Sequence, residues 1–209
     1  MAVTVQWLGH ASFRISNGGI VVYIDPWKLT ESKHDADVVL VSHSHYDHYS
    51  SEDVAAVSTE DTELIASHDV IDSSGKGQAI APGETIEGCG VRISAVAAYN
   101  PNKQFHPKTN NWNGYIVELD SKRIYYAGDT DLTDEMRAVR GIDLGLFPVG
   151  GTYTMNAGEA AEAAGFMKPK LAVPYHWGDI VGGRGDADSF AAKAVCEVKV
   201  IEAGGIVEL

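Results

Sequence analysis

The chain has 209 residues, which is enough to bury the core of one domain without help from disulfides. Its 44% hydrophobic and 22% charged residues are typical of a globular protein, and two cysteines are too few for a zinc ribbon or a disulfide framework. The net charge of −13 repels polyanions and argues against a nucleic-acid partner. With no signal-peptide pattern and no apolar run near the roughly 20 residues that cross a bilayer, we expect a cytoplasmic protein without a membrane partner.

Short strands dominate the predicted secondary structure. Alternating or buried apolar runs, separated by turn residues such as Asn17-Gly18-Gly19, are typical of strands. A polar loop over residues 99–113 is long for a compact domain, and loops of this length are usually functional or mobile. The predicted strands cover residues 3–8, 13–16, 20–24, 38–41, 64–66, 79–80, 85–86, 91–97, 115–119, 124–127, 144–148, 171–174, 198–201 and 206–208.

Helix start and stop residues predict four helices. Capping boxes open two of them, at Ser50 with Asp53 and at Asn156 with Glu159. Many strands with helices spread along the chain indicate two packed sheets with helices outside, in one domain over residues 1–209. The predicted helices run from Ser50 through Val57, from Thr133 to Gly141, from Asn156 to about Lys168, and over residues 189–195.

Residues 43–48 read His-Ser-His-Tyr-Asp-His, directly after the predicted strand 38–41. His43 and His45 point the same way in an extended chain because side chains alternate along a strand. Asp47 and His48 lie in the turn before the first helix, so the segment directs two pairs of ligands into one cleft. Surface histidines explain this poorly, because packed imidazoles repel once protonated and need partners when buried. The segment therefore predicts half of a two-metal site.

Further ligands follow other strands. Asp129 comes after strand 124–127, and its two carboxylate oxygens can bridge two cations; His176 comes after strand 171–174. Alone, each would be an ordinary turn aspartate or core histidine, but the first cluster requires partners.

Three histidines compete to complete the first metal site. His106 in the polar loop is our choice, whereas His68 after strand 64–66 is the alternative and could instead line the cleft. His34 lies in a charged connection, where we expect it to be solvated. His10 lies in a tight turn between strands and is a candidate to support a ligand or to contact substrate.

The resulting ligand set mixes nitrogen and oxygen donors and lacks thiolates, which favours Zn²⁺, with Mn²⁺ or Fe²⁺ as alternatives. Two cations about 3.5–4 Å apart lower the pKa of a bridging water, which favours hydroxide attack on a carbonyl or phosphoryl centre. Asp47, beside that water, is expected to accept or deliver the proton. The set assigns His43, His45 and His106 to one ion, Asp47, His48 and His176 to the other, and Asp129 to both.

Three motifs resemble the signature of the metallo-β-lactamase superfamily and occur in that family's order: His43-x-His45-x-Asp47-His48, Gly128-Asp129-Thr130, and His176 at a strand end. Three more resemble its branch of small metal-dependent hydrolases, which includes ascorbate-6-phosphate lactonase: Trp7-Leu8-Gly9-His10, Ile24-Asp25-Pro26, and residues 147–152. The resemblance implies a four-layer αββα sandwich, with the metals at one edge between the sheets. It also implies that the residues assigned above hold the metals.

Residues around the ligands are expected to support them or to contact the substrate. Asp25 is expected to orient a ligating histidine, since such imidazoles usually donate their other N–H to a carboxylate; the alternative is an ordinary turn residue at the strand end before Pro26. Thr152 is a candidate substrate contact. In much of the family a histidine soon follows the strand that matches residues 91–97, but here Tyr99-Asn100 stands there and His106 comes later. Either the loop carries His106 back to the metal, or one site is incomplete.

Residue chemistry narrows the reaction. His45 stands where oxygen-reducing di-iron relatives usually have glutamate, and Asp129 stands where lactam hydrolases commonly have cysteine. We therefore expect a hydrolase that cleaves an ester, lactone or phosphoester bond. Lys103 and Lys108 in the polar loop and Arg184 near the C-terminus lead us to expect a small anionic substrate. Two alternatives remain: a metal-binding or sensor protein without turnover, and an inert sandwich with clustered surface histidines.

Overall fold

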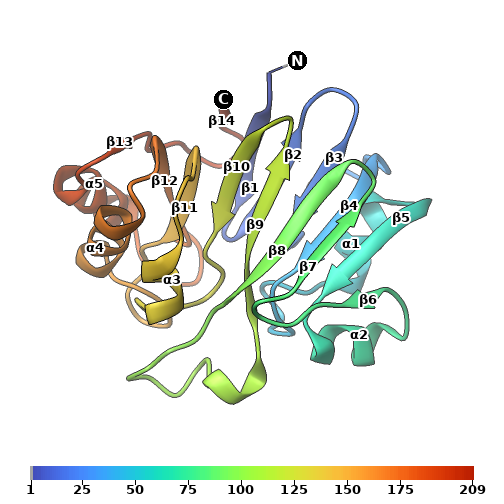
Figure 1. The fold of residues 1–209 in the computed structure, drawn as a ribbon, viewed down its shortest axis with the longest axis horizontal. Helices are drawn as coiled ribbons and strands as arrows, with labels where there is room; N and C mark the ends of the chain where they lie inside the picture. The colour runs from blue at the N-terminus through green and yellow to red at the C-terminus, as the bar shows by residue number, and fades with distance from the viewer. Residues whose placement is uncertain (1) are drawn as a thin grey trace.

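The computed structural model, which describes residues 2–209, contains two seven-stranded sheets (Figure 1). Each sheet has four antiparallel strands followed by three strands added in parallel. The first sheet has the order β14 (Ile206–Glu208), β1 (Thr4–Gly9), β2 (Ser12–Ser16), β3 (Val21–Ile24), β4 (Ala36–Val41), β5 (Ser58–Ala66) and β6 (Gln78–Ala79). The second has the order β13 (Glu197–Val198), β12 (Leu171–Tyr175), β11 (Leu144–Pro148), β10 (Lys122–Tyr126), β9 (Asn113–Leu119), β8 (Val91–Ala97) and β7 (Thr85–Gly88).

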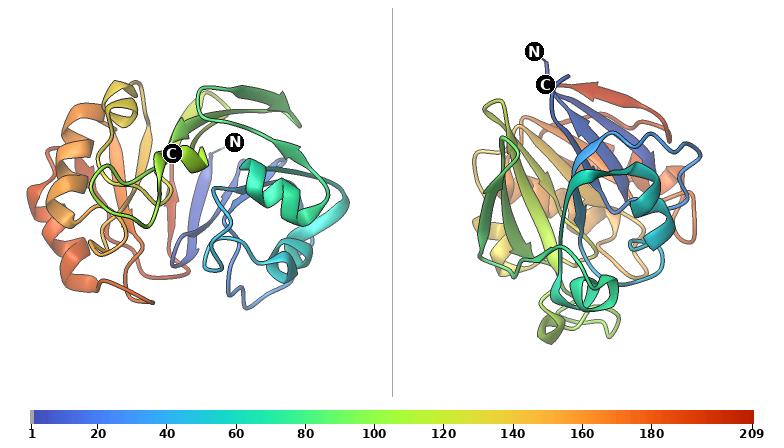
Figure 2. Two further views of the ribbon diagram at one scale, coloured as in Figure 1. Left: turned by 90° about the horizontal axis from the view of Figure 1, so that it is seen from below. Right: turned by 90° about the vertical axis from the view of Figure 1, so that its right-hand side faces the viewer.

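Helices cover the outer faces of the two sheets. Helices α1 (Ser51–Val57) and α2 (His68–Ser74) contact the first sheet, whereas α4 (Ala157–Met167) and α5 (Arg184–Lys193) contact the second; α3 (Asp134–Ala138) packs between α4 and β8. Figure 2 shows α1 and α2 on the side of the molecule opposite α4 and α5. This arrangement confirms the αββα sandwich. None of the helices among residues 2–209 is long and apolar enough to span a bilayer.

Aromatic side chains join the two sheets at the centre of the main hydrophobic core. Phe13 from the first sheet meets Tyr175 from the second edge to face, with ring centroids 5.4 Å apart, and Tyr175 stacks on Tyr126 at 5.2 Å. All three side chains are buried. Aromatic residues bury large apolar areas, and paired rings add about 0.5–1.5 kcal/mol beyond that burial. The core therefore holds the ends of β2, β10 and β12 in fixed relative positions.

Each predicted strand overlaps a strand of the structure, although the one expected over residues 198–201 is only Glu197–Val198, and three helices differ from expectation. Helix α2 was not predicted, because its seven residues are too few to show a clear apolar period. Helix α5 begins at Arg184 and ends at Lys193, whereas the expected range was 189–195. Its polar first turn hides the start, where the Asp186 carboxylate accepts a hydrogen bond from the Gly183 N–H at 2.9 Å. The expectation for this helix was wrong at both ends.

Helix caps explain the remaining boundaries. The Asn156–Glu159 capping box is present. The Ser50 hydroxyl caps α1, but the Asp53 carboxylate accepts bonds from the backbone of residues 28 and 29 instead of closing the box. Thr133 caps α3 as expected, yet the helix ends at Ala138 and not at Gly141. Val139 has already left the helical conformation, with ψ at 134°, and the Arg140 guanidinium donates to the carbonyls of Arg137 and Val139 there.

Candidate metal centre

The candidate ligands gather where strands of both sheets end. Asp25 follows β3 and His43 comes two residues after β4, while Asp129 comes three residues after β10 and His176 follows β12. Parallel strands end at the same edge of a sheet, and functional groups of such folds collect there. The packing of the two sheets brings both edges together. Each of these four side chains is buried.

Three groups of nitrogen and oxygen atoms are compact enough for one cation each; one of them, Asp25 with His43 and His48, shares its histidines with the other two. In the first of those two, His43, His45 and His106 each offer one atom, and these atoms lie within 4.8 Å of one another. The second group contains Asp47, His48 and His176, together with His10. The structure thus brings together every residue that the sequence assigned to either ion, and it adds His10 to the second group.

Asp129 lies between the two groups. Its Oδ1 is 3.2 Å from His48 Nε2 and 3.3 Å from His176 Nε2, both in the second group. Its Oδ2 is 3.3 Å from His106 Nε2 in the first group. One oxygen therefore faces each group, which is the orientation that a carboxylate shared by two cations requires.

Several buried polar atoms of the centre form no hydrogen bond, and this bears on whether metals fit there. Nε2 of His48, His106 and His176, and Oδ1 of Asp129, are buried, and although the nitrogens lie within 3.3 Å of the Asp129 oxygens, these atoms form no aligned hydrogen bond. Leaving such a group unpaired costs about 1–3 kcal/mol, so native proteins rarely do so without a ligand, water or ion nearby. These atoms converge on a shared space, and imidazole with carboxylate is a donor set that suits Zn²⁺. The residues present therefore fit a metal.

Burial and neighbouring charges prepare the centre for cations. Burial, with His48 next to it, holds the pKa of His43 well below its usual value, so His43 stays neutral. Burial also opposes the charged form of His48, but the carboxylates of Asp129 and Asp25 outweigh it and raise the pKa of His48 well above normal. For Asp129, burial is likewise outweighed, and His176 and His48 hold its pKa well below normal. Asp129 is therefore an anion.

Asp25 supports the ligands from behind. Its carboxylate accepts hydrogen bonds from the Ser42 N–H at 2.7 Å, the Ser42 hydroxyl at 2.5 Å and the Tyr126 hydroxyl at 2.6 Å. It also lies 2.7 Å from His48 Nδ1, which leaves Nε2 of that ring free to face Asp129. The Ser42 hydroxyl in turn lies 2.9 Å from His43 Nδ1. Asp25 thus has the orienting geometry expected from the sequence.

Asn100 explains how the long polar loop returns His106 to the centre. The Asn100 side-chain oxygen accepts a bond from the His106 N–H at 3.0 Å and lies 2.8 Å from His106 Nδ1. The Asn100 N–H donates to the His106 carbonyl at 2.8 Å. His68, the competing candidate, is exposed on α2. The residue that stands near the family's histidine position therefore orients the histidine that comes later.

Trp112 is a site residue that the sequence argument missed. Its indole ring lies against His43 and His45, with centroids 4.7 Å apart in both cases, and 5.6 Å from the ring of His106. Its Nε1–H donates to Asp69 at 2.8 Å. A tryptophan in an otherwise polar loop was the one available signal. The indole shields the first group of ligands from solvent.

His10 contacts Asp47, as a candidate supporting residue should. Its Nε2 lies 3.1 Å from Asp47 Oδ2, and its ring centroid is 4.1 Å from that of His176. The backbone of His10 has a positive φ of 44°, which the bond from the Trp7 indole to the His10 carbonyl helps to hold. Its Nδ1 is buried and has no hydrogen-bond partner.

Lys108 and Thr152, both candidate substrate contacts, lie outside the cavity at the ligands. Lys108 pairs with Glu135 at 2.7 Å, and Thr152 is exposed. The other two cations that suggested an anionic substrate are also paired, Lys103 with Asp131 at 2.6 Å and Arg184 with Asp188 at 2.9 Å. Each of these cations therefore has an acidic partner, and none of them lines the cavity at the ligands, so an anionic substrate stays a prediction that these three side chains do not support.

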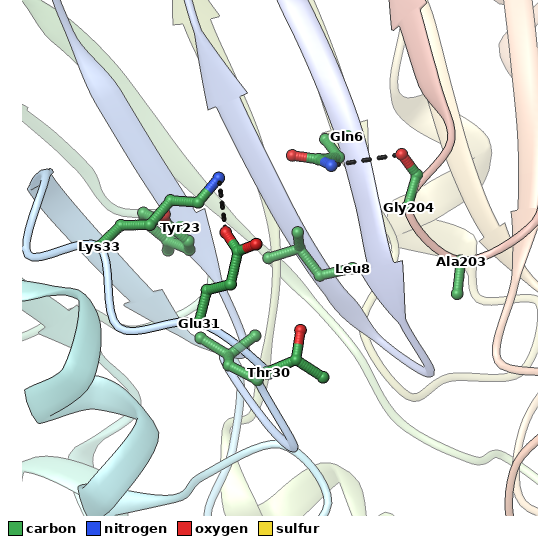
Figure 3. A pocket seen from close by; sticks show the side chains of 9 residues that line it. Gln6, Leu8, Tyr23, Thr30, Glu31, Lys33, Ala203 and Gly204 are labelled. Atoms are coloured by element: carbon green, nitrogen blue, oxygen red, sulfur yellow. Dashed lines mark hydrogen bonds and ion pairs between the residues drawn. The ribbon is translucent and has the colours of Figure 1, made fainter.

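A cavity of about 240 Å³ opens onto the ligands. Besides His45, Asp47, His106 and Asp129, its walls come from three aromatic residues, Tyr46, Phe105 and Tyr153. A second cavity of about 380 Å³ lies over the outer face of the first sheet and is lined by residues that include Leu8, Tyr23 and Glu31 (Figure 3). None of its lining residues belongs to the candidate metal centre. The cavity at the ligands is the one that places a substrate against them.

Comparison with known proteins agrees with this geometry. A family profile described as "Beta-lactamase superfamily domain" matches residues 4–176. A "UPF0173 metal-dependent hydrolase" of Thermococcus onnurineus is 31% identical over 99% of this chain and all of its own, and one of Thermus thermophilus is 32% identical over 92% and 91%. A solved structure from Parabacteroides distasonis, assigned as a metal-dependent hydrolase, is 31% identical with a TM-score of 0.84, over 95% of this chain and 92% of that one. The chain therefore belongs to the metallo-β-lactamase superfamily, as one of its metal-dependent hydrolases.

Proposed function

We propose that the protein is a two-metal hydrolase that cleaves an ester, lactone or phosphoester bond of a small molecule. The position of Asp129 carries the proposal, because its two oxygens face the two histidine groups at 3.2–3.3 Å. His43, His45 and His106 would hold one ion, and Asp47, His48 and His176 the other. We assign Zn²⁺ to both positions, with Mn²⁺ or Fe²⁺ as alternatives.

When bound, two divalent cations lower the pKa of a water held between them and so supply a hydroxide nucleophile near neutral pH. Asp47 is the residue that we assign to proton transfer. Its carboxylate lines the cavity, where it can accept a proton from the nucleophile and deliver it to the leaving group. His10 holds Asp47 Oδ2 at 3.1 Å, which fixes the direction of that carboxylate.

The surroundings of Asp47 keep its carboxylate ionised although it is largely buried. Burial acts to raise the pKa of Asp47, but the contact with His10 and the charge of His48 lower it below the usual value. The carboxylate is therefore ionised at neutral pH, as a proton acceptor must be. Asp47 also remains partly exposed, with 13% of its side chain accessible, so a substrate in the cavity can reach it.

Metal analysis combined with a substrate panel tests the proposal. Purified protein should hold two divalent ions per chain and hydrolyse at least one member of a panel of esters, lactones and phosphodiesters. Replacing Asp47 with asparagine should lower the rate by about 10²–10⁴-fold, the usual contribution of a general acid or base. Asp72→Asn on the exposed face of α2 is the matched control. Two bound ions without any hydrolysis would favour the sensor alternative instead.

A further inference from the structure

Aromatic side chains form the outer wall of the cavity at the metal centre. Phe105 and Tyr153 meet edge to face with ring centroids 4.8 Å apart. Phe105 is 45% exposed, and Tyr46, which stands between His45 and Asp47 in the chain, is 69% exposed. Apolar surface of this kind beside a cavity marks a binding site more often than it marks a free surface.

The aromatic pair is held in place relative to the ligands. Phe105 directly precedes His106 in the chain. The Asn100 side chain, which contacts His106, also donates to the Tyr153 carbonyl at 2.9 Å. Lys103 donates to the next carbonyl, that of Thr154, at 2.6 Å. These bonds join the loop of Phe105 to the loop of Tyr153, so the wall is preorganised and its distance from the centre is fixed.

None of the residues that line the cavity is a lysine or an arginine, so apart from the metal ions themselves the wall offers no cation to an anionic side group. The ionised residues that line the cavity are acidic, and the cations nearest to them in sequence, Lys103 and Lys108, pair with Asp131 and Glu135. Lys28 lies over the ring of Trp27, which meets the Tyr46 ring at 6.1 Å, and pairs with Asp179 at 2.8 Å. The net charge of −13 adds a general repulsion of anions.

We propose that the site selects substrates in which an uncharged aromatic group lies next to the scissile bond, and that Phe105 and Tyr153 bind this group. The inference rests on the proposed hydrolytic function and defines its substrate class. The cavity volume of about 240 Å³ suits it, because an apolar cavity of about 150 Å³ holds a benzene ring. An edge-to-face pair presents both a ring face and a ring edge, which are the surfaces that a third ring packs against.

Binding of an inert analogue tests the wall without requiring turnover. Uncharged 3-phenylpropanamide, titrated into metal-loaded protein and followed by protein NMR shifts, should bind at the cavity. Phe105→Ala should raise its Kd about tenfold, which corresponds to the roughly 1.4 kcal/mol of a ring–ring contact. Phe166→Ala, which removes another partly exposed phenylalanine on α4, should leave Kd unchanged. No binding at millimolar concentration, or an unchanged Kd in both Phe105→Ala and Tyr153→Ala, would overturn the inference.

Matched substrates then test selectivity. Methyl 3-phenylpropanoate, its 4-carboxyphenyl analogue and methyl butyrate share one scissile ester with similar reactivity, and the same three side groups can be placed on a lactone and a methyl phosphodiester. The uncharged aromatic member should have the highest kcat/KM in whichever series is hydrolysed, and Phe105→Ala should remove that preference. A preference for the carboxylated member overturns the inference while leaving the hydrolytic function intact. Binding of the amide without hydrolysis of any series would instead refute the hydrolytic function alone.

Discussion

Asp25→Asn is the substitution that separates support of the ligands from the ligands themselves. Asp25 Oδ2 meets Ser42 Oγ, Tyr126 Oη and His48 Nδ1, and its Oδ1 accepts the Ser42 N–H. An asparagine keeps the shape, but its NH₂ group must face at least one of these donors. The lost hydrogen bond to a charged acceptor is worth about 1.5–3 kcal/mol. Since supporting residues of this type usually change metal affinity by about 10–100-fold, we expect a loss in that range.

Competition with a chelating dye measures the affinity of the Asp25→Asn protein for Zn²⁺. Asp143→Asn is the matched control, because Asp143 also accepts a backbone N–H, from Arg123 at 2.8 Å, but lies at the opposite end of β11 from the centre. The control should lose stability on heating without losing affinity. Equal Zn²⁺ affinities for Asp25→Asn and the wild type would refute the orienting role, provided that both proteins are folded by circular dichroism.

Three further predictions follow from the same geometry. His106→Ala should lower the metal content to about one ion per chain by elemental analysis, whereas His68→Ala should leave it unchanged; the opposite pattern would reverse the ligand assignment. Because the pKa of His48 is raised in the metal-free protein, its proton competes with metal at neutral pH, and affinity should fall as pH decreases. Calorimetry in buffers of different ionisation enthalpy should detect the release of that proton when metal binds. If no proton is released, the competition between the His48 proton and the metal is contradicted. Lys108→Ala should leave KM and its salt dependence unchanged, because Glu135 already pairs with this lysine, and a salt-sensitive rise in KM would restore an anionic substrate.

Local sequence patterns were sufficient for much of the fold. Strand β4 contains the apolar run 38–41, β11 has no charged residue, and the Asn156 capping box marks the start of α4, so each of these signals lies within a few residues. The start of helix α5 was predicted wrongly because it depends on the Asp186 carboxylate, which accepts a hydrogen bond from the Gly183 N–H, and the first turn of the helix is polar. Short helices with polar first turns are therefore the elements that local periodicity misses.

The centre was predictable where ligands cluster in sequence and less so where the fold assembles them. Four potential ligands lie within the six residues from His43 to His48, and His176 follows a recognisable strand. The return of His106 depends on Asn100, and that contact exists only once the loop has folded. The pairing of Lys103 and Lys108 with acidic residues more than twenty positions away could not be predicted from the sequence, so the anionic substrate stays a prediction without support from these two side chains.

We propose that Asp129 is shared by two metal ions, one in each histidine group. Crystals grown with Zn²⁺ and measured on both sides of the zinc absorption edge can show this, because anomalous scattering locates each ion independently. We expect two peaks about 3.5–4 Å apart, with the Asp129 carboxylate between them. A single peak, or a second ion that does not contact Asp129, would contradict it.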